Sequence, residues 1–192
     1  MGSCTKIYFY VLTSLLTAIL TASMRLFIIL MLFSSFAYGQ KKAEVLNFQT
    51  AKLNDTVPGS LNKQRLLSTL GKPTKIENFD AECALTDEQE KAKVKKLYFY
   101  GKTKFFIFDN KAELTIVDFR SGMFTYKTFK LYLTKATTLQ QVQKLYPNSV
   151  KAALKENGGK MVRLKPCKDC DGQCLLYFEN GKLVQLEWWE EC

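Results

Sequence analysis

The sequence predicts an α+β fold built from two tandem units, each with a short helical layer packed on an antiparallel β-sheet. Three observations lead to this prediction. The order of extended segment, short helix, connection and hairpin occurs twice along the chain. The predicted helices begin at capping residues and are too short to be stable without packing against a sheet. The last hairpin turns at Asn-Gly, the dipeptide that most favours a tight two-residue turn.

The repeat is visible in three pairs of segments that keep the same order and lie 70–78 residues apart. The pairs are residues 48–53 with 126–131, residues 62–66 with 138–142, and residues 106–110 with 176–180. Matches that recur in one order indicate a duplicated supersecondary unit. The repeat therefore predicts a first unit over residues 40–120 and a second unit, with a cysteine-rich C-terminal hairpin, over residues 121–192.

In the first unit, a helix is expected to begin after Asn62, a favourable N-cap residue. The leucines from Leu66 to Leu70 share one face of this helix, so they are expected to pack on the sheet. Gly71 is a natural C-terminal stop, and Pro73 prevents the helix from continuing. A further short helix is expected to start after Thr86.

In the second unit, Thr138 is expected to cap a helix that carries Val142 and Leu145 on its apolar face and ends at Pro147. Another short helix is expected to start near Ser149, to turn Val150, Ala153 and Leu154 inward and to stop at Asn157-Gly158-Gly159. Both units thus follow the same plan, in which a capped helix precedes the hairpin.

The hairpins complete each unit. The first is expected over residues 104–109 and 114–119, joined by a loop longer than two residues. The second turns at Asn180-Gly181, where both positions accept positive φ, and the resulting register pairs Tyr177 with Val184.

An aromatic binding surface is expected on the outer face of the sheets. Alternation along the last strand puts Trp188 on the core side and Trp189 on the opposite, more polar side. Exposed tryptophan is enriched where protein partners dock. We expect Phe119, and then Phe124 and Tyr126 on the strand that follows, to extend this surface.

The N-terminus is typical of an export signal. Residues 1–39 contain no acidic residue, and Met24 is a plausible true start because Arg25 and the apolar run after it form a compact secretory signal. A small-residue site, Ala37-Tyr38-Gly39, predicts cleavage near Gly39-Gln40 and a periplasmic or secreted protein. The alternative is a retained membrane anchor, because residues 7–38 together are long enough to span a bilayer.

Composition limits the chemistry and the partners. The chain of 192 residues has 28 basic and 18 acidic residues and no histidine, which excludes histidine-dependent catalysis and imidazole metal sites. Cleavage leaves 153 residues with a net charge of +8. Because the lysines are scattered and the protein is expected to be exported, nucleic acid is not an expected partner. Attraction to anionic lipid, and with it peripheral membrane association, stays open.

The pattern from Asn62 through Leu66 and Leu70-Gly71 to Pro73, followed by a hairpin, resembles the helix signature of the small outer-membrane assembly lipoproteins of the SmpA/OmlA (BamE) group. A doubled unit of this length resembles the tandem-repeat architecture of the β-lactamase inhibitor protein. The resemblance covers residues 40–192 and implies helices packed on antiparallel sheets and a role in binding other proteins. The chain departs from the lipoprotein group because no cysteine stands at the predicted mature end.

Four cysteines form the densest cluster of reactive residues: Cys167, Cys170, Cys174 and Cys192. After export, an oxidising compartment favours disulfides among them. The hairpin register makes Cys170–Cys192 the first choice of pair and Cys167–Cys192 the second. The alternatives are a metal site of these four thiolates and a redox-active Cys-x-x-Cys pair. Cys83 is the expected odd cysteine.

Together these observations predict an exported, non-enzymatic module that binds another envelope or extracellular protein. No catalytic residue and no cofactor are expected. The alternative is a periplasmic thiol-redox or metal-binding protein that uses the C-terminal cysteines.

Overall fold

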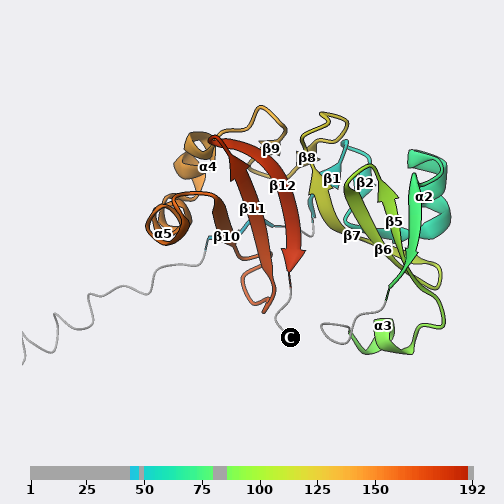
Figure 1. The fold of residues 1–192 in the computed structure, drawn as a ribbon. Helices are drawn as coiled ribbons and strands as arrows, with labels where there is room; N and C mark the ends of the chain where they lie inside the picture. Colours follow the sequence, from blue (N-terminus) through green and yellow to red (C-terminus); the bar gives the residue numbers. More distant parts are fainter. Residues whose placement is uncertain (1–43, 48–49, 80–85, 190–192) are drawn as a thin grey trace, which may run out of the picture. The chain divides into compact units, whose positions relative to one another are not determined.

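A computed structural model describes residues 44–47, 50–79 and 86–189, all within a compact unit that spans residues 43–192 (Figure 1). The predicted signal peptide, Cys83 and Cys192 lie outside the described residues. The fold combines antiparallel sheets with short helices, as expected from the sequence. None of the described helices is long and apolar enough to cross a membrane.

The larger sheet contains eight strands, of which seven form a continuous path in the order β10-β11-β12-β7-β6-β5-β4. The eighth, β3, pairs with the first half of β7, while β12 pairs with the second half. The bounds of these strands are β3 (Ser60–Asn62), β4 (Lys75–Asn78), β5 (Lys95–Tyr100), β6 (Thr103–Phe108), β7 (Lys111–Asp118), β10 (Met161–Leu164), β11 (Gln173–Glu179) and β12 (Lys182–Trp189).

The path joins two meanders, in which strands that follow each other in sequence also pair in space. One meander runs from β4 to β7 and the other from β10 to β12. Their last strands, β7 and β12, pair antiparallel through three residue pairs: Ile116 with Glu187, Val117 with Leu186, and Asp118 with Gln185. The two meanders are therefore joined into one sheet at this junction.

A smaller sheet has the order β2-β1-β8-β9, with β1 (Lys52–Leu53), β2 (Val57–Pro58), β8 (Tyr126–Lys127) and β9 (Tyr132–Leu133). The strand expected around Phe124 and Tyr126 is thus interrupted by a turn over residues 128–131. Thr128 closes that turn, because its Oγ1 accepts from the Leu131 N–H at 2.9 Å and donates to the Leu131 carbonyl at 3.0 Å.

The helices begin where their capping residues predict. Helix α2 (Lys63–Leu70) has Asn62 as its N-cap and Gly71 as its C-cap. Helices α3 (Asp87–Lys91) and α4 (Leu139–Leu145) both start with a capping box, at Thr86 and Thr138. Helix α5 (Pro147–Asn157) starts two residues before the expected Ser149, because proline at the first helical position is already arranged for a helix.

In two of the helices, the first residue donates a backbone hydrogen bond to a hairpin turn. The Lys63 N–H at the start of α2 donates to the Asn110 carbonyl at 2.8 Å. The Leu139 N–H at the start of α4 donates to the Gly181 carbonyl at 2.9 Å. Asn110 and Gly181 are the second residues of the two turns that join β6 to β7 and β11 to β12.

The first hairpin differs from the expectation, which was a loop longer than two residues. Phe108 pairs with Lys111, so only Asp109 and Asn110 form the turn. Asp109 adopts positive φ (49°), and its Oδ1 accepts from the backbone N–H groups of Lys93 and Val94, both at 3.0 Å. Aspartate tolerates this conformation better than most residues, so a turn without glycine is possible here.

The second hairpin turns at Asn180 and Gly181 as expected, with φ of 52° and 71°. The register beyond the turn was predicted wrongly. A bulge between Tyr177 and Phe178 shifts the pairing by one residue, so Tyr177 pairs with Gln185 and not with Val184. Bulges insert one unpaired residue, and an alternating pattern does not reveal their position.

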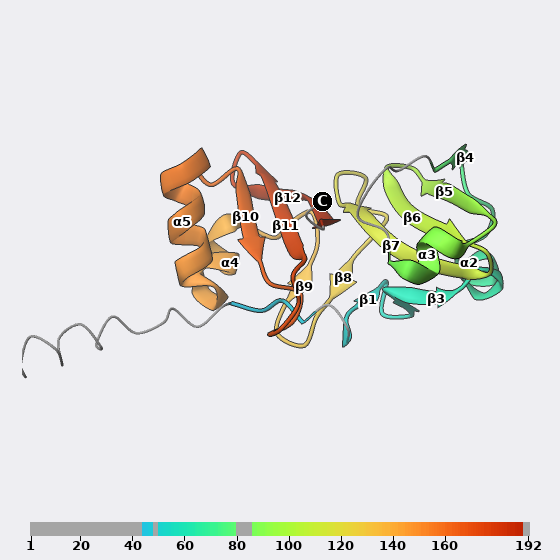
Figure 2. The ribbon, with the colours of Figure 1, turned by 90° about the horizontal axis from the view of Figure 1, so that it is seen from below.

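The main core lies on one face of the large sheet. Leu66 of α2, Val142 of α4 and Val150 of α5 are fully buried and belong to the same apolar cluster as Phe105 and Leu186 of the sheet. The expectation that Leu145 and Leu154 also pack inward is wrong, because they are 40% and 47% exposed at the margins of their helix faces. Figure 2 shows α4 and α5 beside β10 and β11. The small sheet adds side chains to the same cluster, so helices and small sheet form one layer against the large sheet.

The N-terminal segment is fastened to α5. Glu44 accepts hydrogen bonds from the Asn148 N–H and side-chain amide at 3.1 Å and from the Ser149 N–H at 2.8 Å. Burial by itself raises the pKa of Glu44, but these bonds outweigh burial and lower the pKa below its usual 4.5. Glu44 thus supplies the cap that the Tyr146 side chain does not provide.

Candidate functional site

The face of the large sheet that is turned away from the main core is the candidate binding surface. Residues paired directly across antiparallel strands lie on the same face. One such row crosses all seven strands of the path, and we call it the cross-sheet row: Arg163, Leu175, Glu187, Ile116, Lys104, Phe99 and Lys75.

Side chains in this row are accessible and alternate between apolar and charged. Arg163 and Lys75 at its ends are exposed, whereas Leu175 is buried and the remaining members are half-buried. Near β4, the Lys75 and Lys104 ammonium groups lie 5.7 Å and 5.3 Å from the centre of the Phe99 ring. Each contact is a cation–π interaction, which holds the ring between two positive charges.

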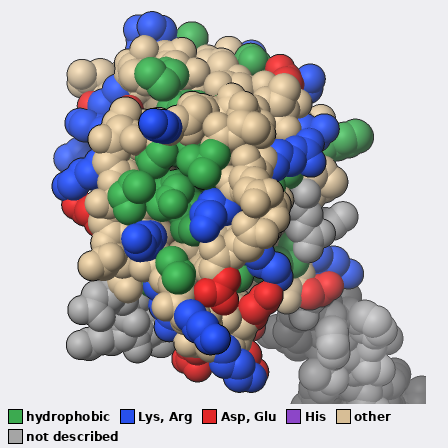
Figure 3. Space-filling model, turned by 90° about the vertical axis from the view of Figure 1, so that its right-hand side faces the viewer, with side chains coloured by type: hydrophobic (Ala, Val, Ile, Leu, Met, Phe, Trp, Pro, Cys, Tyr) green, Lys and Arg blue, Asp and Glu red, His purple; other side chains and the backbone are tan. Residues whose placement is uncertain are grey.

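Apolar and basic side chains also lie next to one another on the side of the molecule where α2 and β4 are found. Figure 3 shows hydrophobic side chains gathered among lysine and arginine side chains there, with acidic side chains concentrated at one end. Ile76, on edge strand β4, is 50% exposed. Ile76 pairs with Tyr98, which packs against the main core, so this exposed residue lies on the opposite face from the cross-sheet row.

The two tryptophans lie on opposite faces, as predicted. Trp188 pairs with Cys174 and packs against the main core. Trp189 pairs with Gln173 on the other face and is 38% exposed. Trp189 therefore lies beside the cross-sheet row, on the same side as Glu187.

The expectation that Phe119, Phe124 and Tyr126 extend an exposed aromatic surface is wrong. Their exposed fractions are 0%, 3% and 0%. Tyr126 pairs with Leu53 on one side and Leu133 on the other, both fully buried. The three rings fill the main core next to the small sheet, because burying a large ring gains more free energy than exposing it.

A tyrosine and a glutamate interact within the candidate surface. The Tyr177 hydroxyl is hydrogen-bonded to Glu187, and its pKa is raised to about 12 by burial first and then by the Glu187 charge. The Tyr177 side chain is therefore neutral at physiological pH. It presents a polar, uncharged group beside the cross-sheet row.

Part of this face is covered by the connection between β4 and β5. Phe106 and Phe108 are nearly fully buried there, and the Phe79 ring lies 4.3 Å from the Phe106 ring. In α3, the Gln89 side chain donates to Glu113 at 2.7 Å, and Glu88 forms an ion pair with Lys111. The accessible part of the face is thus confined to the cross-sheet row and the strands toward β10.

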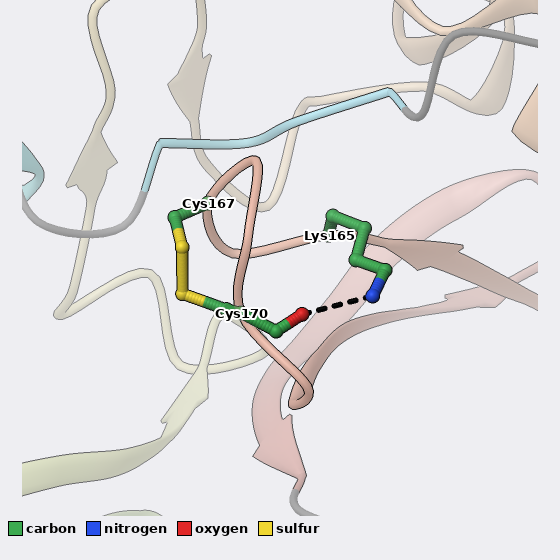
Figure 4. The surroundings of a disulfide bond; sticks show 3 residues. All are labelled: Lys165, Cys167 and Cys170. Atoms are coloured by element: carbon green, nitrogen blue, oxygen red, sulfur yellow. Dashed lines mark hydrogen bonds between the residues drawn. A yellow bond between two sulfur atoms is a disulfide. The ribbon is translucent and has the colours of Figure 1, made fainter.

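The cysteine-rich loop between β10 and β11 holds a disulfide. Cys167 and Cys170 are bonded to each other, with Cα atoms 5.3 Å apart (Figure 4). A disulfide among the four candidate cysteines is confirmed, but the preferred pairs were wrong, because Cys167 and Cys170 are joined to each other and not to Cys192. The Lys165 ammonium donates to the Cys170 carbonyl at 2.8 Å and closes the loop beside the bond.

Cys174 is a buried free thiol. It lies on β11 within the main core, and burial raises its pKa to about 12. At neutral pH this thiol is protonated, so it is a poor nucleophile and a poor metal ligand. Among the described residues, no group of three cysteine or acidic side chains is arranged to hold a metal ion.

Several members of the candidate surface were not found from the sequence. Phe99, Lys104, Ile116 and Glu187 come from four strands, and only the pairing of β7 with β12 brings them into one row. Within each strand, the available signal was the two-residue period by which side chains alternate between the faces of a sheet. That signal shows which residues share a face of one strand but not which strands are neighbours.

Comparison of the chain with protein families, with curated proteins and with solved structures finds no match.

Proposed function

We propose that this protein is an exported, non-enzymatic module that binds another envelope or extracellular protein through the accessible face of its large sheet. The observation that carries the proposal is Trp189, a large aromatic side chain 38% exposed on the face away from the main core. Tryptophan at such a position is enriched among the residues that dominate binding energy.

The chemistry of the neighbouring residues supports a protein partner. Phe99, Ile116 and Trp189 provide apolar contact area, and Lys104 and Arg163 provide charged groups around them. Protein interfaces combine an apolar centre with a polar rim, and aromatic and arginine residues are enriched in them. The cross-sheet row contains three basic residues and one acidic residue, Glu187. The expected partner therefore presents acidic groups near its own apolar patch.

We also propose that the described chain consists of two tandem units, residues 40–120 and residues 121–192. The hydrogen bonds from Lys63 to Asn110 and from Leu139 to Gly181 support this, since each joins the first residue of a helix to the same position of a hairpin turn. The N-cap residues Asn62 and Thr138 also bridge the strand that follows each turn.

Export is supported by two features. Residues 1–39 have the composition of a secretory signal with a cleavage site near Gly39-Gln40. The Cys167–Cys170 disulfide fits an oxidising compartment, where such bonds persist. The N-terminal mass of the protein purified from an expressing bacterium tests the cleavage site directly.

A thiol-redox function is the second candidate, and one observation favours it. Cys167 and Cys170 have the Cys-x-x-Cys spacing and lie in a partly exposed loop. However, this pair lies between two strands and not at the start of a helix, so no helix dipole stabilises a thiolate. Thiol titration and metal analysis of the purified protein separate this candidate from the first.

A capture experiment with matched variants tests the binding proposal. Protein immobilised on beads is incubated with native envelope extract, and bound proteins are identified by mass spectrometry. Trp189→Ala and Lys104→Glu are expected to lose the partners that the unmodified chain retains. Ile76→Ser, which changes an exposed apolar residue on the opposite face of the sheet, is the matched control and keeps them.

Thermal unfolding of each variant separates binding from stability. Trp189→Ala is expected to leave Tm within a few degrees of the unmodified protein, because its side chain is partly exposed. Unchanged capture by both interface variants would contradict the proposed surface. Unfolding of Trp189→Ala would contradict its assignment as an accessible residue.

A further inference from the structure

One stretch of the chain carries basic residues and no acidic residue. Residues 119–155 contain seven basic residues and no acidic residue: Arg120, Lys127, Lys130, Lys135, Lys144, Lys151 and Lys155. The stretch includes β8, β9, α4 and most of α5. The elements β8, β9 and α4 are found in the upper part of Figure 1. In this region positive charge is concentrated, although lysines are scattered over the chain as a whole.

Exposed apolar side chains are concentrated in the same stretch. Among the described residues, five of the eight large hydrophobic side chains that are exposed belong to it: Met123, Phe129, Tyr132, Leu145 and Leu154. Phe129 is 85% exposed, the highest value among them. Exposed apolar groups are costly to leave in water, and where they form a contiguous patch they mark a site for a protein or a membrane.

The fold brings several of these residues together. Phe129 and Lys130 form the tip of the turn between β8 and β9, and Tyr132 is the first residue of β9. Tyr132, Lys144 and Leu145 line one hollow of about 320 Å³. The tip of the turn, the start of β9 and the end of α4 therefore form one continuous surface.

The lysines of this surface keep their charge available. Arg120 is engaged by Asp118 and Glu179, and Lys127 pairs with Asp55 at 3.0 Å. Over the part of the chain that the structure describes, Lys130, Lys135 and Lys144 have no carboxylate within 4.0 Å. Their positive charges are thus free to interact with an anionic surface.

We propose that this surface binds peripherally to an anionic lipid bilayer. We call it the lipid-binding end and define it by Phe129, Lys130, Tyr132, Lys135, Lys144 and Leu145. Phe129 inserts among the acyl chains, Tyr132 lies at headgroup level, and the lysines contact lipid phosphates. The proposal goes beyond the proposed function, because it concerns a different surface from the cross-sheet row and a different class of partner.

Charge complementarity and the type of apolar residue together favour lipid over nucleic acid. Proteins that bind single strands stack bases on aromatic rings, and of the apolar residues that define this end Leu145 offers no flat face for stacking. Aliphatic side chains gain free energy when they enter hydrocarbon, and free lysines near the membrane surface add attraction. An export signal would also bring the protein to a membrane-bounded compartment.

Flotation with lipid vesicles tests the proposal. The protein starting at Gln40 is used, because the compact unit begins at Ala43 and the apolar N-terminal segment would bind vesicles by itself. One set of vesicles contains phosphatidylcholine alone, and the other contains phosphatidylcholine with 30% phosphatidylglycerol. We expect at least tenfold more bound protein on the anionic vesicles at low salt, and a decrease at 0.5 M salt.

Variants separate insertion from simple charge attraction. Phe129→Ser and the double variant Lys130→Glu with Lys144→Glu are each expected to lower binding at least fivefold, without a change in Tm because these side chains are exposed. Ile76→Ser and Lys72→Glu, at exposed positions near the opposite edge of the sheet, are the matched controls and bind as the unmodified protein does.

Two outcomes overturn the proposal. The first is equal binding to both kinds of vesicle, or no binding at all. The second is binding that depends on the lysines but not on Phe129 and that a DNA oligonucleotide competes away, which would indicate general attraction to polyanions. Because Trp189 is not involved, neither outcome bears on the protein-binding face.

Discussion

The two helix–hairpin contacts of the molecule have the same geometry but different sequences. In one, α2 meets the Asp109-Asn110 turn, and in the other α4 meets the Asn180-Gly181 turn. The hydrogen bonds differ in length by only 0.1 Å, at 2.8 Å and 2.9 Å. The comparison teaches that the same backbone contact forms with different side chains around it.

The surroundings of the two contacts differ more than the contacts themselves. The first helix is followed directly by β4, whereas α4 continues into α5 through Pro147. The first turn is tied by the Asp109 carboxylate to the connection before β5. The second turn relies on glycine, and its half of the sheet carries the disulfide. These differences define four experiments.

The largest expected effect comes from the single buried residue of each helix. Leu66 in α2 and Val142 in α4 are both the fourth residue of their helix and are 0% exposed. Leu66→Ala is expected to reduce the free energy of unfolding by about 3 kcal/mol, and Val142→Ala by about 2 kcal/mol because fewer carbon atoms are lost. Urea unfolding measures both. If only one variant is destabilised, the two positions are not equivalent.

Removal of the disulfide is expected to affect the second half of the sheet. The bond joins residues three apart in sequence, so Cys167→Ser with Cys170→Ser should cost about 2 kcal/mol or less in the chain-entropy model. Hydrogen exchange is expected to become faster in β10 and β11 and to stay unchanged in β5 and β6. Faster exchange in both meanders would show that the loop supports the whole sheet.

The turns themselves are expected to differ in their tolerance of substitution. Gly181 has φ of 71° and open space around a Cβ, so Gly181→Ala should cost about 1 kcal/mol from the backbone alone. Asp109→Asn should cost less than about 0.5 kcal/mol, since asparagine accepts positive φ and keeps a side-chain oxygen. Thermal unfolding compares them, and an equal loss would contradict this account of the first turn.

The smallest effect concerns the N-terminal segment, which caps α5 but has no counterpart at α2. Glu44→Gln should lower the free energy of unfolding by about 0.5 kcal/mol at pH 7, through loss of one acceptor and of a charge near the helix start. Because folding lowers the pKa of Glu44, its contribution is present above pH 4.5 and is lost as the pH falls through the folded value.

The pH dependence provides the control for this variant. Denaturant midpoints of the unmodified protein and of Glu44→Gln should converge at acidic pH. A difference between them that stays constant from pH 7 to pH 3 would mean that the carboxylate charge contributes nothing.

Local chemistry made much of the fold predictable. Asn62, Thr86 and Thr138 cap helices through their own side chains, and Asn180-Gly181 forms its turn from two adjacent residues. The bulge at Tyr177 and the two-residue turn at Asp109 were missed. Both depend on contacts from elsewhere in the chain, such as those of the Asp109 carboxylate with Lys93 and Val94, so a local pattern does not encode them.

Less of the candidate site was predictable. Trp189 was placed correctly because alternation along one strand decides which side faces out. Phe119 and Tyr126 were misplaced, since no pattern within their own segment indicated that the small sheet packs against the main core. The disulfide partner of Cys170 was also predicted wrongly. The prediction used the strand register, whereas the conformation of the short loop decides which cysteine lies next to Cys170.

The pairing of β7 with β12 has a consequence for the order of synthesis. Ile116 is made 71 residues before its partner Glu187, which takes roughly 4–14 s at usual rates of translation. Until β12 is made, β3 covers only the first half of that edge of β7, and the residues from Ile116 to Asp118 form an open strand edge. Such an edge readily pairs with other chains, so the first half of the sheet is exposed to aggregation until β12 covers this edge.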